Sequence, residues 1–277
     1  DVCSSDLGDS ITVSYTGGSG TGAVSYSTAS TTCSVDTSTG DVALLGAGNC
    51  IVMVTKAADG NYTEASSNIT ISIAKAVQAT VTATPSRTTG VYADAVSTTV
   101  SGSGGSGTGS FSYASTTASV CSVNASTGAV TILTAGTCSI TVTKATDTNY
   151  NSATGSTSIV VSKATQATVT ATKSANTTYG SATQITVTGS GGSGTGSFNY
   201  ASTTTGICTI NASTGVIAIV TAGDCVLTAT KAADTNYNSA SSNVTITIAK
   251  ATQAAVTASA TRTTSTYADG TSNTVAL

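Results

Sequence analysis

Residues 121–144 read CSVNASTGAVTILTAGTCSITVTK. Apolar and polar residues alternate in runs separated by Gly and Asn turns, which is the period of half-buried β-strands and not of a helix. Cys121 falls on the same strand face as Val123, and Cys138 falls on the same face as Ile140. The stretch therefore predicts strands whose aliphatic face carries both thiols into one core, while the Ser and Thr face meets water.

The same pattern returns along the chain with a period of 87 to 88 residues. Cys33, Cys121 and Cys208 are spaced by 88 and 87 positions, and a second cysteine and a tyrosine keep the same offsets. These further positions are Cys50, Cys138 and Cys225, together with Tyr62, Tyr150 and Tyr237. A fixed period indicates tandem copies of one structural unit.

One period carries seven predicted strands and no helical periodicity. In the second repeat the predicted strands are residues 78–84, 97–103, 110–116, 119–123, 129–133, 138–144 and 157–162. Short antiparallel strands with turn signals every 8 to 12 residues or so are typical of an immunoglobulin-like sandwich. The strand pattern therefore predicts an all-β fold class of tandem immunoglobulin-like β-sandwich domains. Because no Gly or Pro separates Ile73 from Gln78, we expect a short, stiff junction, so that the domains are arranged end to end.

The period also sets the predicted domain boundaries. Residues 1–7 (DVCSSDL) break the register and look like translated sequencing-adapter sequence, so we interpret them as a non-authentic leader. Residues 11–15 align with residues 273–277, which indicates three periods cut within a domain. The predicted domains are repeat 1 at 8–76, which lacks its first strand, repeat 2 at 77–164, repeat 3 at 165–251, and the opening strands of a fourth repeat at 252–277.

The composition argues against several classes of function. Charged residues are 8% of the chain, against about a quarter in ordinary soluble domains, and there is no His and no Trp. With imidazole absent and Glu64 the single glutamate, we expect no catalysis and no cofactor. A net charge of −3 without a basic stripe predicts no nucleic-acid partner, and no apolar run is long enough to predict a membrane-spanning segment.

The register-matched cysteines are predicted to form one disulfide in each repeat: Cys33 to Cys50, Cys121 to Cys138 and Cys208 to Cys225. The members of each pair lie 17 positions apart, and a crosslink closing such a loop contributes roughly 3 kcal/mol in the chain-entropy account. Buried free thiols in a reducing compartment are the alternative, whereas disulfides indicate an extracellular or cell-surface location. Zinc is disfavoured, since two thiolates fill only half of a tetrahedral shell.

Three aspartates stand two positions before an Asn and three before the repeated Tyr: Asp59, Asp147 and Asp234. This spacing favours an Asx turn, although it also resembles a site for a hard cation such as calcium, which needs six to eight oxygens. We expect the turn to place a structural tyrosine corner over the end of each sandwich, with the phenol bonded to backbone. The tyrosines concerned are Tyr62, Tyr150 and Tyr237.

Glycine-rich stretches and lysines also recur in register. The stretches 17–22, 104–109 and 191–196 precede strands and not helices, so we favour a flexible loop at a domain tip over a phosphate-binding or recognition loop. A Lys-to-Asn isopeptide crosslink needs a buried carboxylate beside the pair, and only the turn aspartates could supply one. The lysines Lys56, Lys144 and Lys231 are therefore interpreted as solvated strand ends.

The chain resembles the tandem immunoglobulin-like repeats, of the Big and MBG kind, found in large bacterial surface or secreted adhesin-type proteins. The resemblance is carried by the stretch 104–109 leading into Phe111 and Tyr113, by AGTC at 135–138 and by KAADTNYN at 231–238, with variants in every repeat. It implies an extracellular structural array, as a stalk, fibre or adhesin spacer.

Two alternatives to the structural array stay open. One is a carbohydrate- or surface-binding adhesive module. The other is a filament subunit that polymerises by strand exchange, in which the strand predicted at 253–259 fills the vacant edge of repeat 1 in another molecule. The expected partners are accordingly neighbouring repeats or like subunits in a fibre, or a surface or glycan.

Overall fold

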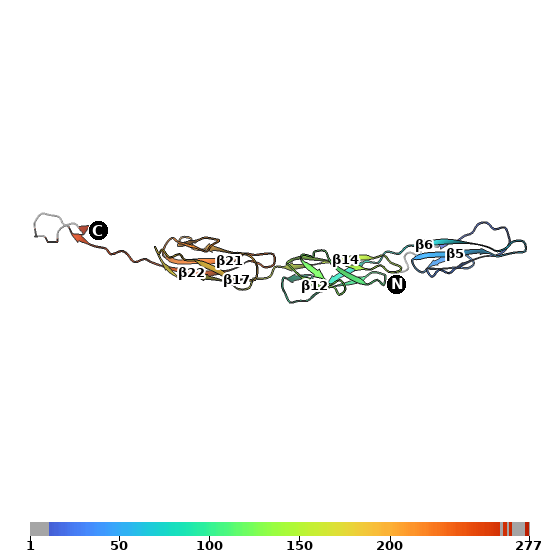
Figure 1. The fold of residues 1–277 in the computed structure, drawn as a ribbon, viewed down its shortest axis with the longest axis horizontal. Coiled ribbons are helices and arrows are strands. Elements are labelled where there is room, and N and C mark those ends of the chain that lie inside the picture. Colours follow the sequence, from blue (N-terminus) through green and yellow to red (C-terminus); the bar gives the residue numbers. More distant parts are fainter. Residues whose placement is uncertain (1–10, 261–262, 265, 268–274, 277) are drawn as a thin grey trace. The chain divides into compact units, whose positions relative to one another are not determined.

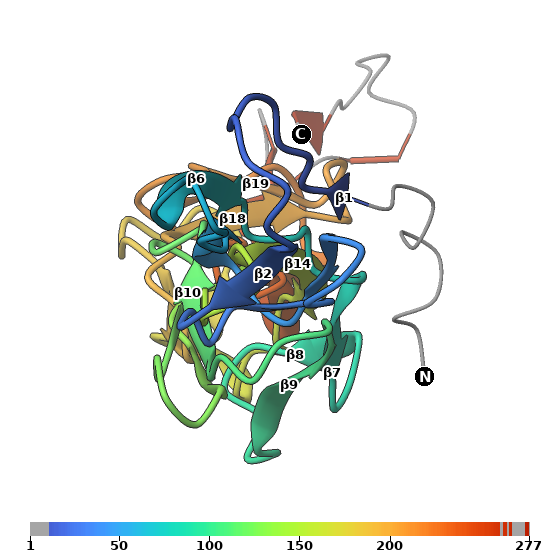
Figure 2. The ribbon, with the colours of Figure 1, turned by 90° about the vertical axis from the view of Figure 1, so that its right-hand side faces the viewer.

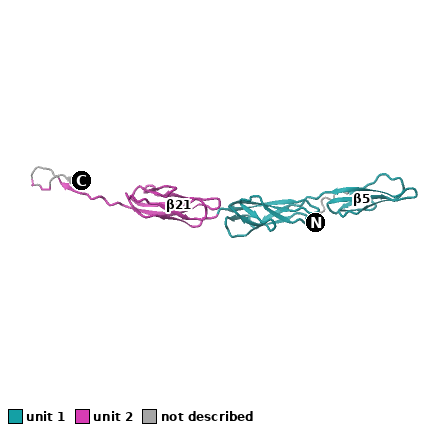
Figure 3. Cartoon of the chain, in the orientation of Figure 1, with its two compact units in different colours: residues 1–163 teal, residues 164–277 magenta. Residues whose placement is uncertain are grey.

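The computed structural model describes residues 11–260, 263–264, 266–267 and 275–276. The chain divides into two compact units, residues 1–163 and residues 164–277 (Figure 3). Every regular element in the described residues is a β-strand, so the predicted all-β class of tandem sandwiches is confirmed. No helix in those ranges could cross a membrane. The leader predicted at residues 1–7 lies outside the described residues.

Repeat 1, in the first unit, is a sandwich of two three-stranded sheets with the orders β1-β4-β3 and β2-β5-β6. The bounds are β1 Ile11–Thr12, β2 Val24–Thr28, β3 Cys33–Val35, β4 Asp41–Leu44, β5 Gly48–Lys56 and β6 Ala65–Ile73. β5 and β6 pair antiparallel along their whole length and lie side by side in Figure 1. Val42 from the first sheet and Val52 from the second belong to one buried cluster, which is the core.

Repeat 2, in the same unit, has two four-stranded sheets with the orders β11-β12-β9-β7 and β10-β13-β14-β8. The bounds are β7 Val81–Pro85, β8 Thr89–Val91, β9 Thr98–Gly104, β10 Phe111–Ser115, β11 Cys121–Val123, β12 Ala129–Ile132, β13 Gly136–Lys144 and β14 Ala153–Ser162. β7 lies beside β9 at one edge (Figure 2). Pro85 ends this edge strand, where its missing N–H is tolerated.

All seven strands predicted for repeat 2 are present, and the structure adds an eighth that the sequence pattern does not predict. This strand, β8, has three residues and pairs in parallel with β14. Its sequence, Thr-Gly-Val, is too short to show alternation, and its partner lies about seventy residues further along the chain. The segment that begins repeat 2 therefore contributes to both sheets, since β7 belongs to one sheet and β8 to the other.

Repeat 3, in the second unit, repeats this plan. The sheet β16-β22-β21-β18 packs against the pairs β15-β17 and β19-β20, which an isolated bridge between Thr186 and Val216 connects. The bounds are β15 Val169–Lys173, β16 Thr177–Thr178, β17 Val187–Gly191, β18 Phe198–Ser202, β19 Cys208–Ile210, β20 Ile217–Ile219, β21 Gly223–Lys231 and β22 Ala240–Ala249. Beyond it, β23 (Ser259–Ala260) pairs with β24 (Val275–Ala276).

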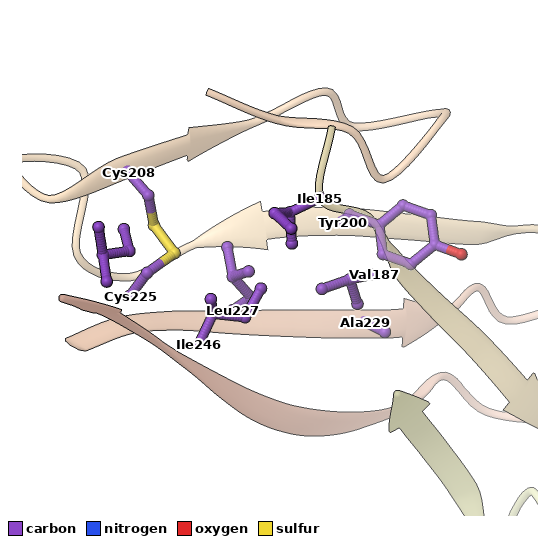
Figure 4. Close-up of a cluster of buried hydrophobic side chains, with 9 residues drawn as sticks. Ile185, Val187, Tyr200, Cys208, Cys225, Leu227, Ala229 and Ile246 are labelled. Carbon is purple, nitrogen blue, oxygen red and sulfur yellow. A yellow bond between two sulfur atoms is a disulfide. The ribbon is translucent and has the colours of Figure 1, made fainter. Parts of the chain in front are cut away.

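The core of repeat 3 is small and aliphatic (Figure 4). Leu227 and Ile246 are fully buried between the sheets, with the Cys208–Cys225 disulfide at one end of the cluster and Tyr200 at the other. Each of the three repeats has a cluster of this kind that includes both cysteines. The disulfide is therefore a component of each core and not a surface crosslink.

Candidate functional site

The structure contains a disulfide in each repeat. The pairs are Cys33–Cys50, Cys121–Cys138 and Cys208–Cys225, with Cα atoms 5.7, 5.6 and 5.7 Å apart. Each bond joins strands of opposite sheets, namely β3 to β5, β11 to β13 and β19 to β21. None of the six cysteines is more than 3% exposed, so these disulfides hold the sandwiches together and are shielded from solution thiols.

The Asx turn predicted at Asp147 is confirmed, and its carboxylate does more than close the turn. Oδ1 accepts hydrogen bonds from the backbone N–H groups of Asn149 at 2.9 Å and Tyr150 at 2.8 Å. Oδ2 accepts from the N–H of Thr108, which belongs to the glycine-rich stretch. Asp59 and Asp234 make the same three contacts in their repeats. Each carboxylate thus ties the turn to the glycine-rich stretch of its repeat.

These N–H donors lower the pKa of all three carboxyl groups to about 2, because hydrogen bonds to the charged form favour it. For Asp147 the largest contribution comes from the N–H of Thr108, and for Asp234 it comes from the N–H of Thr195. For Asp59 the N–H of Asn61 contributes most. The carboxylates therefore act as charged acceptors at neutral pH.

The lowered pKa of Asp147 predicts a pH dependence of stability. Since the folded-state pKa lies below the ordinary value of 3.8, the stabilisation is complete above about pH 4 and is lost as the pH falls toward 2. We expect Asp147→Asn to be less stable than the wild type at pH 6 and to lose less stability between pH 4 and pH 2. Denaturant midpoints of repeat 2 across this range measure both effects. Parallel profiles for the two proteins would contradict the role given to Asp147.

The chain that enters repeat 2 is bonded directly to this turn. Within the first unit, the N–H of Ala76 donates to the carbonyl of Asn149 at 2.8 Å, and the N–H of Asn151 donates back to the carbonyl of Ala76 at 2.9 Å. This is a short parallel bridge opposite Tyr150. Ala164 makes the same pair of bonds with Asn236 and Asn238 inside the second unit. The entering chain therefore becomes part of the edge of the repeat that it enters.

Side chains reinforce the joint between repeats 1 and 2. The ammonium of Lys75 donates to Thr146 Oγ1 at 3.1 Å and to the carbonyl of Asp147 at 2.5 Å. Asn151 Nδ2 donates to the carbonyl of Lys75 at 3.1 Å. From the body of repeat 1, the N–H of Ala47 donates to Asn149 Oδ1 at 2.9 Å. Repeat 1 thus contacts the turn of repeat 2 both through the linker and through its β4–β5 loop.

A buried glutamine follows the linkers that enter repeats 2 and 3, and no role is predicted for it from the sequence. Gln78 is 7% exposed, and its amide donates to the carbonyl of Ala145 and accepts from the N–H of Gly107 at 3.0 Å. Gln166 accepts in the same way from Ser193 and Gly194. The recurrence of Gln at 78, 166 and 253 is a sequence signal that could reveal the contact.

The glycine-rich stretch is a packed segment, in contrast to the flexible loop expected from its composition. Gln78 and Asp147 hold the N–H groups of Gly107 and Thr108. A Cβ atom on Gly109 would overlap the carbonyl oxygen of Ala145, the residue after β13, so the two backbones lie too close together for any side chain. The glycines therefore serve close packing at this end of the sandwich.

The interpretation of the register-matched lysines as solvated strand ends is wrong for Lys144. This side chain is 9% exposed, and its ammonium lies 4.7 Å from the centre of the Phe111 ring, a cation–π contact. Lys231 lies over Phe198 at 5.0 Å in the same way. The burial arises because the glycine-rich stretch folds over the lysine stem, where a Cβ on Gly105 would meet it.

Repeat 1 builds the same contact with a ring from another strand position. Lys56 lies 5.7 Å from the ring of Tyr15, which occupies the position of Gly102 in repeat 2. Val24 in turn replaces Phe111. In repeat 2 a Cβ on Gly102 would collide with the Phe111 ring, so only one of the two positions can carry an aromatic side chain. This exchange indicates that each repeat retains an aromatic ring beside its lysine, whichever strand position supplies the ring.

The tyrosine-corner role of Tyr62, Tyr150 and Tyr237 stays a prediction. Their backbone groups belong to the Asx turns, and Tyr62 is 52% exposed. Phenol-to-backbone bonds do occur at two other tyrosines, for which the sequence predicts no such bond. Tyr113 accepts from the N–H of Gly102 at 3.1 Å, and Tyr200 accepts from the N–H of Gly189 at 3.0 Å.

The chain matches no known protein family and no curated protein sequence. Among solved structures it is similar to mouse cadherin-23 EC22-24, with 12% identity over 82% of this chain and 86% of that chain and a TM-score of 0.29. Domains 1-6 of the surface layer protein SbsC show 16% identity over 86% of this chain and 36% of that chain, with a TM-score of 0.27.

A third similar structure is BT4661, a SusE-like, surface-located polysaccharide-binding protein from the heparin utilisation locus of Bacteroides thetaiotaomicron. It shows 10% identity over 86% of this chain and 69% of that chain, with a TM-score of 0.23. Because the sequence identities and TM-scores are this low, the function has to be argued from the residues of the chain itself.

Proposed function

We propose that the chain is a non-enzymatic structural array of extracellular repeats, acting as a stalk, fibre or adhesin spacer of a bacterial surface or secreted protein. The observation that carries the proposal is the joint at Ala76. Both backbone polar groups of this residue are bonded to the turn of the next repeat. A linker held in this way restricts swivelling between neighbours, which is a property that a spacer needs and an isolated binding domain does not.

Two further features support the extracellular part of the proposal. Structural disulfides persist in oxidising environments and are rare in reducing ones, and each repeat has one. The aliphatic cores are small, so a crosslink buried within them contributes a large part of the stability of each sandwich. The Ser- and Thr-rich faces of the strands supply an uncharged polar surface.

The joint predicts that repeats 1 and 2 tumble as one body in solution. In the full chain, ¹⁵N relaxation of their amides is expected to give one rotational correlation time. Ala76→Pro removes the N–H that donates to Asn149 and should lower the correlation time of repeat 1 toward that of an independent domain. Val77→Ala is the matched control, because this neighbouring side chain is 83% exposed. Independent tumbling of the wild-type repeats would contradict the spacer proposal.

A further inference from the structure

The chain segments that enter and leave repeat 2 run parallel to each other. β8 belongs to the entering segment, and it pairs in parallel with β14, the last strand of the repeat. Ahead of β8, the bridge between Ala76 and Tyr150 is also parallel. Repeat 3 has the same two contacts, one between β16 and β22 and one between Ala164 and Tyr237. In both repeats, the entering segment therefore follows the last strand and the turn before it in one direction.

This parallel pairing decides how tension along the chain reaches the hydrogen bonds. Tension pulls the entering segment by its N-terminal end and the last strand by its C-terminal end. In a parallel pair these two ends lie at opposite ends of the ladder, so the strands are sheared past each other and all bonds between them are loaded together. In an antiparallel pair the two pulled ends would be adjacent, and the bonds would open one after another.

In repeat 2 the ladder between the two segments is closed at both ends by main-chain bonds. The N–H of Val160 donates to the carbonyl of Thr88 at 2.9 Å, and the N–H of Tyr92 donates to the carbonyl of Ser162 at 2.9 Å. β8 has three residues, and each of them has a register partner in β14. Shear of this pair therefore has to break several main-chain bonds at once.

An ion pair also fastens β8 to the rest of repeat 2. Arg87 stands before the strand and Asp94 after it, and their side chains are joined by bonds of 2.5 and 2.8 Å. Arg87 Nε donates to Thr98 Oγ1 in β9 of the opposite sheet at 2.6 Å, and Asp94 accepts from the N–H of Val91 at 3.2 Å. The two ends of β8 are thus tied to each other and to the second sheet.

Repeat 3 closes its ladder with a side chain. The strand β16 has two residues, against the three of β8. The N–H of Thr247 in β22 donates to Asn176 Oδ1 at 3.2 Å, at the position where Val160 of β14 donates to a main-chain carbonyl. The ammonium of Lys173 donates to the same oxygen at 2.6 Å. An exposed amide side chain therefore takes the place of a main-chain acceptor in this repeat.

The ionic support of β8 has no counterpart at β16. Ser181 occupies the position of Asp94 in repeat 3. The bond between Arg87 and Asp94 is the single ion pair within the part of the chain that the structure describes. Compared with β8, β16 is shorter and is held by fewer groups.

We propose that repeats 2 and 3 are mechanical clamps, in which a parallel pair of strands resists tension along the chain by shear, and that the clamp of repeat 3 opens first. Its use in the protein rests on the proposed spacer function, because a spacer is the part of a surface protein that carries tension. The order of opening follows from the shorter strand β16, the side-chain acceptor Asn176 and the absence of an ionic support among the described residues of repeat 3.

Force-clamp spectroscopy of the full chain, held by its two ends, tests the proposal. Repeats 2 and 3 span 88 and 87 residues, so we expect two discrete unfolding steps of nearly equal length. Asn176→Ala removes the acceptor for Thr247 and should shorten the waiting time before the first of these steps by about threefold to tenfold, while the second is unchanged. Extension without discrete steps would overturn the proposal, as would shortening of the second waiting time instead of the first.

Asn243→Ala is the matched control. Asn243 Oδ1 accepts from Thr228 Oγ1 at 2.7 Å, so this variant also loses a side-chain bond to β22, but the bond joins β22 to β21 and not to the entering segment. Both variants should lower the denaturant midpoint of repeat 3 to a similar extent, whereas Asn243→Ala should leave both waiting times unchanged. Equal shortening by the two variants, or none by Asn176→Ala, would contradict the clamp. Independent tumbling of repeats 1 and 2 would remove the spacer function without altering these waiting times, so the two proposals fail separately.

Discussion

Replacing Cys121 and Cys138 together by alanine is expected to destabilise repeat 2 by roughly 2–5 kcal/mol. The disulfide closes a loop with a sequence separation of 17 and joins the two sheets through β11 and β13. Both sulfurs lie in a cluster whose other members are mainly Val and Ile, so the variant loses the crosslink and also leaves small cavities. For a small sandwich this is a large part of its total stability.

Hydrogen exchange along a guanidinium series, read peptide by peptide, measures this loss in repeat 2 alone. Ser122→Ala with Ser139→Ala is the matched control, since these residues follow the cysteines in the same two strands and point to the other face. Peptides of repeat 3, which keeps the Cys208–Cys225 bond, should be unchanged. Equal midpoints for the cysteine variant and the control would show that the disulfide contributes little.

The repeat period and the alternation of side chains are enough to predict the disulfides and most of the strands. Cys121 and Cys138 share faces with Val123 and Ile140, and the structure places both cysteines in one core. This succeeds because strand alternation is a local property, and because three copies of each position separate signal from accident. The Asx turn at Asp147 is predictable for the same reason, since its hydrogen bonds span only three residues.

Features that depend on distant parts of the chain are not predictable in this way. β8 exists through its parallel partner β14 and shows no alternation of its own. Lys144 is buried because Phe111 and the glycine-rich stretch enclose it, while its own sequence neighbours are those of an exposed strand end. Gln78 bonds to residues about 30 and 67 positions away. Local pattern carries no information on any of these contacts.

A recurring turn that ends in glycine is only partly predictable from the sequence. Gly40, Gly128 and Gly215 stand in register after Asp or Asn, a variable residue, Ser and Thr. In repeat 3, Asn211 Oδ1 accepts from the N–H groups of Ser213 at 3.0 Å and Thr214 at 2.9 Å. The turn itself is local and can be predicted from the sequence. The reason for glycine at its end is the close approach of a distant backbone carbonyl, that of Val187 in the case of Gly215.

Gly215→Ala is expected to destabilise repeat 3 by roughly 2–4 kcal/mol. Gly215 has φ of 69°, in the left-handed region that costs a residue with a Cβ atom about 1–2 kcal/mol. In addition, a Cβ at this position would overlap the carbonyl oxygen of Val187, whose N–H donates to the carbonyl of Gly215 at 2.9 Å. Relief of the overlap requires β17 to move, and Val187 is one of the fully buried residues of the core.

Gly206→Ala in the same repeat separates these causes from a general effect of losing glycine. A Cβ on Gly206 would meet nothing within 4 Å, and its φ lies outside the left-handed region. Alanine there should leave stability within about 0.5 kcal/mol or raise it by up to about 1 kcal/mol, because it reduces the entropy of the unfolded chain. Denaturation of both variants, followed by exchange in peptides of repeat 3, gives the comparison. If Gly215→Ala were as stable as Gly206→Ala, the turn could relax without moving Val187, and the core of the sandwich would not depend on it.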